Sequence, residues 1–283
     1  MNLPSCTQAL AAAQILGLDR LDAQLLLLHA LDKPAAARGW LLAHDGDELT
    51  QEVADLFRAL SLRRAAGEPL AYLVGSKEFF GLPLRVDARV LVPRPDTETL
   101  VDWSLALLQL PGLPPVLKIL DLGTGSGAIA LAIAHSLQAA GCQAVVTAVD
   151  ASADALDVAR NNAARLGLTV KFIESCWLQQ VNASFHLIAS NPPYIASADP
   201  HLAALVHEPL QALTAGADGL DDIRQIIEQA PAHLLRGGWL LLEHGYDQAV
   251  QVRQLLAKRG FEHVQSRLDL AGIERCSGGQ WPA

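Results

Sequence analysis

The stretch Val116–Gly127, VLKILDLGTGSG, carries an apolar run directly into a turn of alternating glycines. The run Val116–Leu120 predicts a buried strand, because it is short, apolar and bounded by a turn. The glycines permit a sharp reversal of the backbone, and Ala128–Ala139 then continues as an apolar helix. A strand, a tight glycine turn and a helix in this order are typical of the first unit of a parallel sheet.

Strands and helices continue to alternate after this unit, which predicts an α/β fold: a parallel, Rossmann-like sheet with helices on both faces. The expected strands are Val116–Leu120, Ala144–Val149, Val170–Ile173, Phe185–Ser190 and Trp239–Leu242. The later helices are expected at Ala153–Leu166, Ile223–Leu235 and Gln248–Arg259, and Pro231 should kink or split the second of them. Open sheets of this kind bind their ligands at the carboxyl ends of the strands.

The chain before the sheet has a different character. Apolar residues recur at helical spacing at Leu21, Leu25 and Leu28, and again at Val53, Leu56, Phe57 and Leu60. Residues 1–75 therefore predict a small N-terminal helical bundle. Such a unit usually docks a partner or covers a site, and substrate docking is the role expected here. Residues 76–95 contain short strand-like runs, the last at Val90–Val92, and predict a β-hairpin connector. Asp96 is placed to N-cap the first helix of a domain that spans residues 96–283.

The glycine turn is suited to a nucleoside cofactor. Its glycines let the backbone approach a ligand closely, and the following helix offers free N–H groups to a pyrophosphate or a carboxylate. Asp150, at the end of the second strand, is positioned to accept hydrogen bonds from ribose hydroxyls. Both NAD and S-adenosylmethionine carry that ribose, so Asp150 does not separate them. A turn that serves only helix–strand packing is the remaining alternative.

Asn191-Pro192-Pro193-Tyr194 follows the fourth expected strand. Two prolines cannot continue a sheet, so this segment makes a stiff, extended corner with exposed carbonyl groups. The Asn191 amide oxygen and the Tyr194 ring suit a planar –NH2 group, whose hydrogens need acceptors and whose face stacks on a ring. A methyl donor facing an –NH2 group uses such a corner, whereas a dehydrogenase has no evident use for it. The alternative is that Asn191-Pro192-Pro193 is an ordinary turn that binds no ligand.

Composition limits the class of protein. The 283 residues include 51% hydrophobic residues, enough for a sizeable core, and the formal net charge is −9. An acidic chain does not predict broad binding of nucleic acid, although a local basic patch stays compatible with it. The 4 cysteines are far apart, which predicts neither a zinc site nor a disulfide framework. No apolar segment has the length of a membrane span, and a cytoplasmic protein without membrane contact is expected.

In several segments the chain resembles a known family, the N5-glutamine methyltransferases of peptide chain release factors (PrmC, also called HemK). The shared segments are EFFGLPL at 78–84, LVPRPDTE at 91–98, the glycine loop at 121–127, NPPY at 191–194 and LLLEHG at 240–245. Pro93–Glu98 is the most family-specific of these. Asn191–Tyr194 by itself is shared with methylases that act on adenine or cytosine amino groups. The resemblance covers essentially the whole chain and implies a class I S-adenosylmethionine-dependent methyltransferase fold.

The resemblance also implies a reaction and a set of site residues. The enzyme would methylate the glutamine amide in the Gly-Gly-Gln loop of class I release factors, without direct nucleic-acid binding. S-adenosylmethionine would be held by Gly123, Thr124, Gly125, Ser126, Gly127, Asp150, Trp177 and Asn191, and the glutamine by Asn191, Pro192, Pro193 and Tyr194. Family members commonly place an Asp before the Trp, and here Cys176 stands there, which would weaken a contact with the adenine. Trp177 as a core residue is the alternative.

The corner suggests a mechanism. An amide nitrogen is a poor nucleophile, so we expect the Asn191 side-chain oxygen and the Pro192 carbonyl to accept its two hydrogens and fix it opposite the methyl–sulfonium bond. No metal is expected. Two competing functions stay open: a DNA methylase that flips adenine or cytosine into the corner, and a binding module that has lost activity. Gly278-Gly279-Gln280 repeats the motif of the implied substrate, and coincidence is the expected reason.

Overall fold

The computed structural model describes residues 3–110 and 112–282 and divides into two compact units, Met1–Ser76 and Lys77–Ala283. The first unit has one hydrophobic core, and the second unit has two, one on each face of its sheet. None of the helices in these ranges is long and apolar enough to cross a membrane.

The N-terminal unit is helical. Its helices are α1 (Cys6–Ile15), α2 (Arg20–Ala30), α3 (Arg38–Ala43), α4 (Gln51–Ala65) and α5 (Leu70–Val74), with a short 3-10 turn, η1 (Ala35–Ala37), before α3. Side-chain caps fix three of the starts: Ser5 forms a capping box with Gln8, Asp19 caps α2 and Thr50 caps α4.

The buried face of α2 differs from the sequence prediction. The pattern at Leu21, Leu25 and Leu28 predicts the inner face, but Leu21 is 47% exposed. Residues Ala23, Leu26, Leu27 and Ala30 are the buried ones, together with Leu28. The face is wider than expected because both α1 and α4 pack against α2.

The second unit begins with a hairpin and then forms one mixed sheet. Strands β1 (Ser76–Phe79) and β2 (Leu82–Arg85) pair with each other. The seven-stranded sheet has the order β5-β4-β3-β6-β7-β9-β8. Its strands are β3 (Val116–Leu122), β4 (Gln143–Asp150), β5 (Lys171–Glu174), β6 (Phe185–Ser190), β7 (Leu234–Glu243), β8 (Glu262–Leu268) and β9 (Glu274–Gln280). The pairs from β5 to β7 are parallel, and β9 runs antiparallel to both β7 and β8. The predicted Rossmann-like fold is thereby confirmed.

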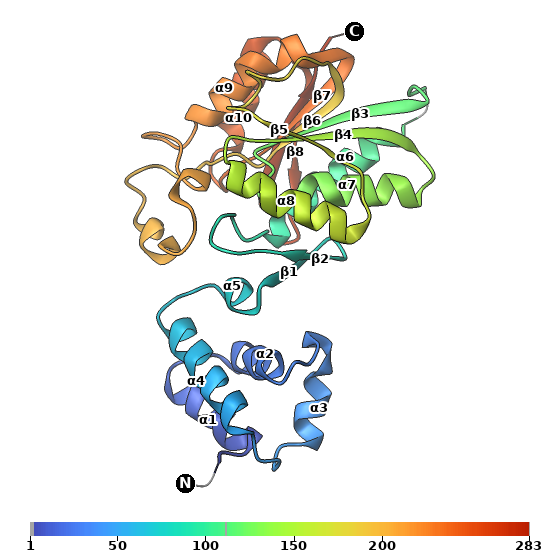
Figure 1. Ribbon diagram of the computed structural model, residues 1–283. Helices are drawn as coiled ribbons and strands as arrows, with labels where there is room; N and C mark the ends of the chain where they lie inside the picture. Colours follow the sequence, from blue (N-terminus) through green and yellow to red (C-terminus); the bar gives the residue numbers. More distant parts are fainter. Residues whose placement is uncertain (1–2, 111, 283) are drawn as a thin grey trace. The chain divides into compact units, whose positions relative to one another are not determined.

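Helices cover both faces of the sheet (Figure 1). One hydrophobic core holds buried residues of α6 (Glu98–Leu108) and α7 (Ala128–Ala139), and the other holds residues of α9 (Asp221–Gln229) and α10 (Ala249–Arg259). Helix α8 (Ala153–Leu166) packs beside β4 and β5. Successive side chains of a strand point to opposite faces of the sheet, so Ile119 and Leu120 of β3 lie in different cores.

Three boundaries differ from the sequence prediction. Helix α9 stops at Gln229, Pro231 lies in the 3-10 turn η5 (Ala230–His233), and β7 starts at Leu234. Residues Val90–Val92 form no strand. Asp96 does not cap α6: it lies in the 3-10 turn η2 (Pro95–Thr97) and pairs with Arg275 at 3.2 Å.

Gly278-Gly279-Gln280 lies inside the sheet as the end of β9. A Cβ added at Gly278 would lie 2.4 Å from Leu241 Cδ2, so only glycine fits between β7 and the core. The Gln280 side chain donates through Nε2 to the Gly237 carbonyl at 2.8 Å. This tripeptide therefore has a structural role in pairing β7, β8 and β9.

Candidate active site

The glycine turn and the ends of four parallel strands enclose a cavity of 260 Å³. Gly123 and Gly125 line it, with φ of 70° and 54°. These left-handed values favour glycine, and because glycine has no side chain this part of the cavity wall is bare backbone. Thr124, Ser126 and Gly127, which the sequence also places at the site, are not among the lining residues.

These three residues of the turn are buried and hold its shape. The Thr124 hydroxyl donates to Asp121 Oδ2 at 2.6 Å, and the Ser126 carbonyl accepts from Asn162 Nδ2 at 2.9 Å. A Cβ at Gly127 would lie 2.9 Å from Leu131 Cδ1, so this glycine allows α7 to pack closely.

Asp121 and Asn162 support the glycine turn through hydrogen bonds, and the sequence alone does not single them out. Asp121 is fully buried, and burial raises its pKa to about 7, although hydrogen bonds from Thr124 and from the Ala130 N–H oppose the rise. Asn162 is also fully buried and bonds both the N–H and the carbonyl of Arg85. Asn162 thereby connects the hairpin to the glycine turn. In the sequence, the feature that could have indicated this contact is a single polar residue on the otherwise apolar face of α8.

Asp150 lines the cavity at the end of β4. Its Oδ2 accepts from the Gly125 N–H at 2.8 Å, and its Oδ1 accepts from the Ser152 N–H at 2.9 Å. Burial raises the pKa of Asp150, and these backbone hydrogen bonds oppose that rise. Each oxygen keeps a second lone pair, so the carboxylate can hold the turn and still accept a hydroxyl.

Trp177 and Cys176 form another part of the wall. Trp177 has a φ of 49°, and its indole nitrogen donates to Asp222 Oδ1 at 3.1 Å. Its ring edge lies 3.4 Å from the place where a Cβ of Gly123 would be. Trp177 packs against the core on one side and faces the cavity on the other. It is therefore both a core residue and a part of the cavity wall. Cys176 is exposed at the cavity.

A second cavity of 450 Å³ lies beside the first. Pro192 and Tyr194 line the second cavity and Pro193 lines the first. Leu91, Asn191 and Ala212 line both. The structure thus brings the two sequence motifs together, with Asn191 at the junction.

Residues of the 91–98 segment and of the loop after Tyr194 close the second cavity. The buried Glu208 carboxylate binds the Arg94 guanidinium and accepts from the Val92 N–H at 3.1 Å. This contact fixes a long loop against the Pro-Arg-Pro segment. Arg94 and Glu208 were not singled out from the sequence, since nothing in the sequence pairs residues so far apart.

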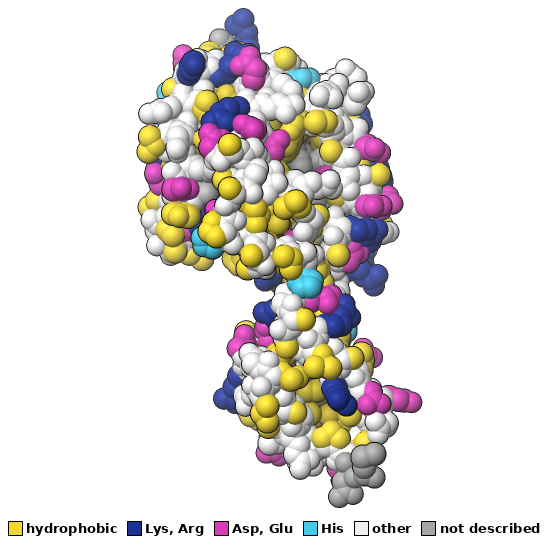
Figure 2. Space-filling model, turned by 90° about the vertical axis from the view of Figure 1, so that its left-hand side faces the viewer, with side chains coloured by type: hydrophobic (Ala, Val, Ile, Leu, Met, Phe, Trp, Pro, Cys, Tyr) yellow, Lys and Arg dark blue, Asp and Glu magenta, His cyan; other side chains and the backbone are white. Residues whose placement is uncertain are grey.

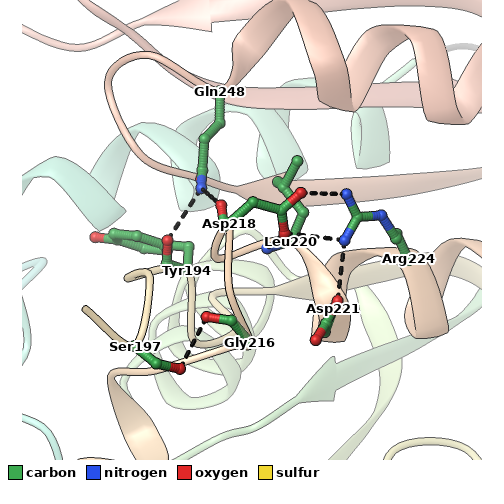
Figure 3. Close-up of polar contacts among 8 residues, drawn as sticks. All are labelled: Tyr194, Ser197, Gly216, Asp218, Leu220, Asp221, Arg224 and Gln248. Carbon is green, nitrogen blue, oxygen red and sulfur yellow. Dashed lines mark hydrogen bonds and ion pairs between the residues drawn. The ribbon is translucent and has the colours of Figure 1, made fainter. Parts of the chain in front are cut away.

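The end of the Asn191–Tyr194 corner is anchored by Gln248 (Figure 3). Gln248 Nε2 donates to the Tyr194 carbonyl at 3.0 Å and to the Asp218 carbonyl at 3.2 Å, while its Oε1 accepts from the Gly245 N–H. Gly219 lies so close that an added Cβ would be 2.1 Å from the Tyr194 carbonyl oxygen. Asp218 is held in turn by the Arg224 guanidinium (Figure 3).

We expect Gln248→Leu to lower the free energy of unfolding by about 1–3 kcal/mol, because three partly buried backbone groups around the corner would lose their partner. Chemical denaturation measures this change. The exposed Gln251→Leu on the same helix is the matched control. Equal stability of the two variants would contradict the anchoring role.

The cavities, the glycine turn and Asp150 fit a methyltransferase, and comparison with known proteins agrees. The PrmC N-terminal domain model matches residues 3–75, and the Methyltransferase small domain model matches residues 101–266. Among solved structures, a methyltransferase from Pyrococcus furiosus covers 80% of this chain and 98% of its own, with a TM-score of 0.53 at 19% identity. The hMettl16 catalytic domain covers 79% of this chain and 82% of its own, with a TM-score of 0.58 at 16% identity. These structures share the fold.

Sequence relatives are much closer. The release factor glutamine methyltransferase of Bordetella pertussis is 49% identical over 93% of this chain and 95% of its own length. Those of Burkholderia pseudomallei and Yersinia pestis are 47% and 46% identical, over 99% and 96% of this chain and 98% and 97% of theirs. With such identity over nearly its whole length, the chain belongs to the release factor glutamine methyltransferase family.

Proposed function

We propose that this protein transfers a methyl group from S-adenosylmethionine to the side-chain amide nitrogen, N5, of the glutamine in the Gly-Gly-Gln motif of class I release factors. The observation that carries the proposal is the position of Asn191 at the junction of two cavities. One cavity has the glycine turn and the acidic residue that a nucleoside cofactor needs, and the other has the corner that suits an amide. The proposed site of the reaction is the cytoplasm, where release factors act.

Gly123, Gly125, Asp150 and Trp177 are the residues proposed to hold the cofactor. The bare glycine wall admits close approach, and the Asp150 carboxylate retains lone pairs for the ribose hydroxyls. Cys176 lies beside Trp177 on the same wall and lacks the acceptor oxygens that an Asp would offer. S-adenosylmethionine, when bound, supplies a methyl group on a positively charged sulfur. Thr124, Ser126 and Gly127 support this wall from behind.

Asn191 and Pro192 are the residues proposed to act on the glutamine. The Asn191 side chain donates through Nδ2 to the Thr97 hydroxyl at 3.1 Å, which leaves its Oδ1 available as an acceptor. Asn191 Oδ1 and the Pro192 carbonyl then accept the two amide hydrogens and hold the nitrogen toward the first cavity. Both oxygens stabilise the positive charge that develops on that nitrogen, so the catalysis is mainly positioning and electrostatics.

The N-terminal unit is proposed to dock the release factor. It has its own core and a groove of 400 Å³ lined by residues of α1 and α4. Figure 2 shows hydrophobic side chains gathered on one face of this unit. A separate docking unit would let the enzyme recognise the folded protein as well as its tripeptide.

An assay with labelled S-adenosylmethionine tests the proposal. We expect transfer to an intact class I release factor, much weaker transfer to a short peptide that contains Gly-Gly-Gln, and none to duplex DNA. Mass spectrometry should place the added methyl group on the glutamine. Transfer to DNA would favour the adenine methylase, and absence of transfer to every substrate would favour the inactive module.

A further inference from the structure

Asp222 lines the first cavity together with Asp150. Asp150 ends β4 and is the residue proposed to bind the ribose hydroxyls. Asp222 lies in the first turn of α9, and no motif of the sequence singles it out. Because a carboxylate at a cavity wall loses water when a ligand enters, it favours a ligand that offers it a hydrogen-bond donor. The surroundings of Asp222 indicate which part of the cofactor could be that donor.

The Asp222 carboxylate is held in place by one of its oxygens. Its Oδ1 accepts from the Trp177 indole nitrogen at 3.1 Å, and the side chain is half-buried. A carboxylate accepts hydrogen bonds at both oxygens, so Oδ2 can accept from a ligand while Oδ1 keeps the indole. The neighbouring Asp221 differs, since its side chain is 64% exposed and binds the Arg224 guanidinium at 2.9 Å (Figure 3). Of these two acidic residues, only Asp222 lines the cavity.

Cys176 and Trp177 show which part of the cavity Asp222 borders. Both residues line the cavity, and Trp177 is bonded directly to Asp222. Cys176 stands at the position where the family resemblance places an Asp against the adenine, and a thiol is only a weak hydrogen-bond acceptor. Adenine carries an –NH2 group whose hydrogens need acceptors. This part of the wall thus offers the indole as an apolar surface for the base and the Asp222 carboxylate as an acceptor for its amino group.

We propose that Asp222 is a specificity-determining residue that accepts a hydrogen from the adenine amino group of the methyl donor, in place of the acceptor that Cys176 does not provide. The inference rests on the proposed function, because it concerns the cofactor of that reaction. It gives the two carboxylates of the cavity separate parts of the nucleoside, with the ribose at Asp150 and the base at Asp222. Such a site prefers adenine to a purine that lacks the amino group.

The first test is calorimetric titration with two ligands: S-adenosylhomocysteine, and its analogue with hydrogen in place of the adenine amino group. The natural chain should bind the first about 5-fold to 30-fold more tightly. Asp222→Asn keeps an oxygen for the Trp177 indole but can turn an –NH2 group toward the cavity. It should weaken S-adenosylhomocysteine by about 5-fold to 30-fold and change the analogue by less than about twofold. The exposed Asp221→Asn is the matched control and should change neither.

The second test moves the acceptor to the other position. Cys176 is exposed at the cavity, so a carboxylate can be introduced there. In the Asp222→Asn background, Cys176→Asp should restore most of the affinity for S-adenosylhomocysteine, whereas Cys176→Asn, which has the same size, should not. Neither change should strengthen binding of the analogue, because the analogue has no amino group to donate.

Three results would overturn the inference. The first is equal loss of affinity for both ligands in Asp222→Asn, which would mean that Asp222 only holds Trp177 in place. The second is equal binding of the two ligands by the natural chain, and the third is failure of Cys176→Asp to restore affinity. Absence of any binding of S-adenosylhomocysteine by the natural chain would instead overturn the proposed function, so the two failures are distinguishable.

Discussion

Asn191→Ala is expected to lower kcat on a release factor by about 100-fold to 1000-fold. The variant loses the side-chain oxygen that accepts one amide hydrogen and stabilises charge on the nitrogen. Pro192 keeps its carbonyl, so a residual rate should remain. The reaction is followed by transfer of labelled methyl to the release factor under single-turnover conditions.

The affinity for S-adenosylmethionine should change by less than about threefold in the same variant, because Asp150 and the glycine wall are untouched. Calorimetric titration measures that affinity. Asn161→Ala, at an exposed position of α8, is the matched control. Turnover close to that of the control would remove Asn191 from the catalytic role.

Asp150→Asn is expected to weaken binding of S-adenosylmethionine by about 10-fold to 100-fold, which corresponds to about 1.5–3 kcal/mol for hydrogen bonds to a charged group. The asparagine would turn an N–H donor toward the Gly125 or the Ser152 N–H, each of which now binds a carboxylate oxygen. The glycine turn would therefore shift, and the ribose would lose a charged acceptor.

Donor affinity is measured by calorimetric titration, and the exposed Asp157→Asn serves as the control. At saturating donor, kcat should recover to within about tenfold of the natural chain, since the amide clamp is intact. A normal dissociation constant would show that Asp150 serves only to hold the turn.

The core of the fold is readable from the sequence because its strands are apolar and end in turn signals. Phe185–Ser190 matches β6 in the structure. Strands β8 and β9 have no such signal: Glu262–Leu268 is largely exposed, and β9 contains two glycines, which weaken a strand on its own. Their structure is decided by pairing, of β9 with β7 and of β8 with β9, and pairing between strands leaves no local pattern in the sequence.

The candidate site was predictable in its chemistry and less so in its geometry. The sequence identifies Asp150 and Asn191 through their place after strands, and both line the cavities. It does not separate Gly123 from Thr124, because the direction of each side chain in a tight turn depends on φ. The contact of Thr97 with Asn191 joins two distant segments, and only the folded chain reveals it.

The position of Gly278-Gly279-Gln280 has a consequence for self-recognition. If the tripeptide alone marked a protein for methylation, every copy of this enzyme would be a target of every other copy. Strand pairing on both sides of β9 hides the backbone of the tripeptide, and the Gln280 amide is already engaged by the Gly237 carbonyl. Discrimination between self and substrate thus lies in conformation: a glutamine can be methylated only when both hydrogens of its side-chain amide are free to bind the enzyme.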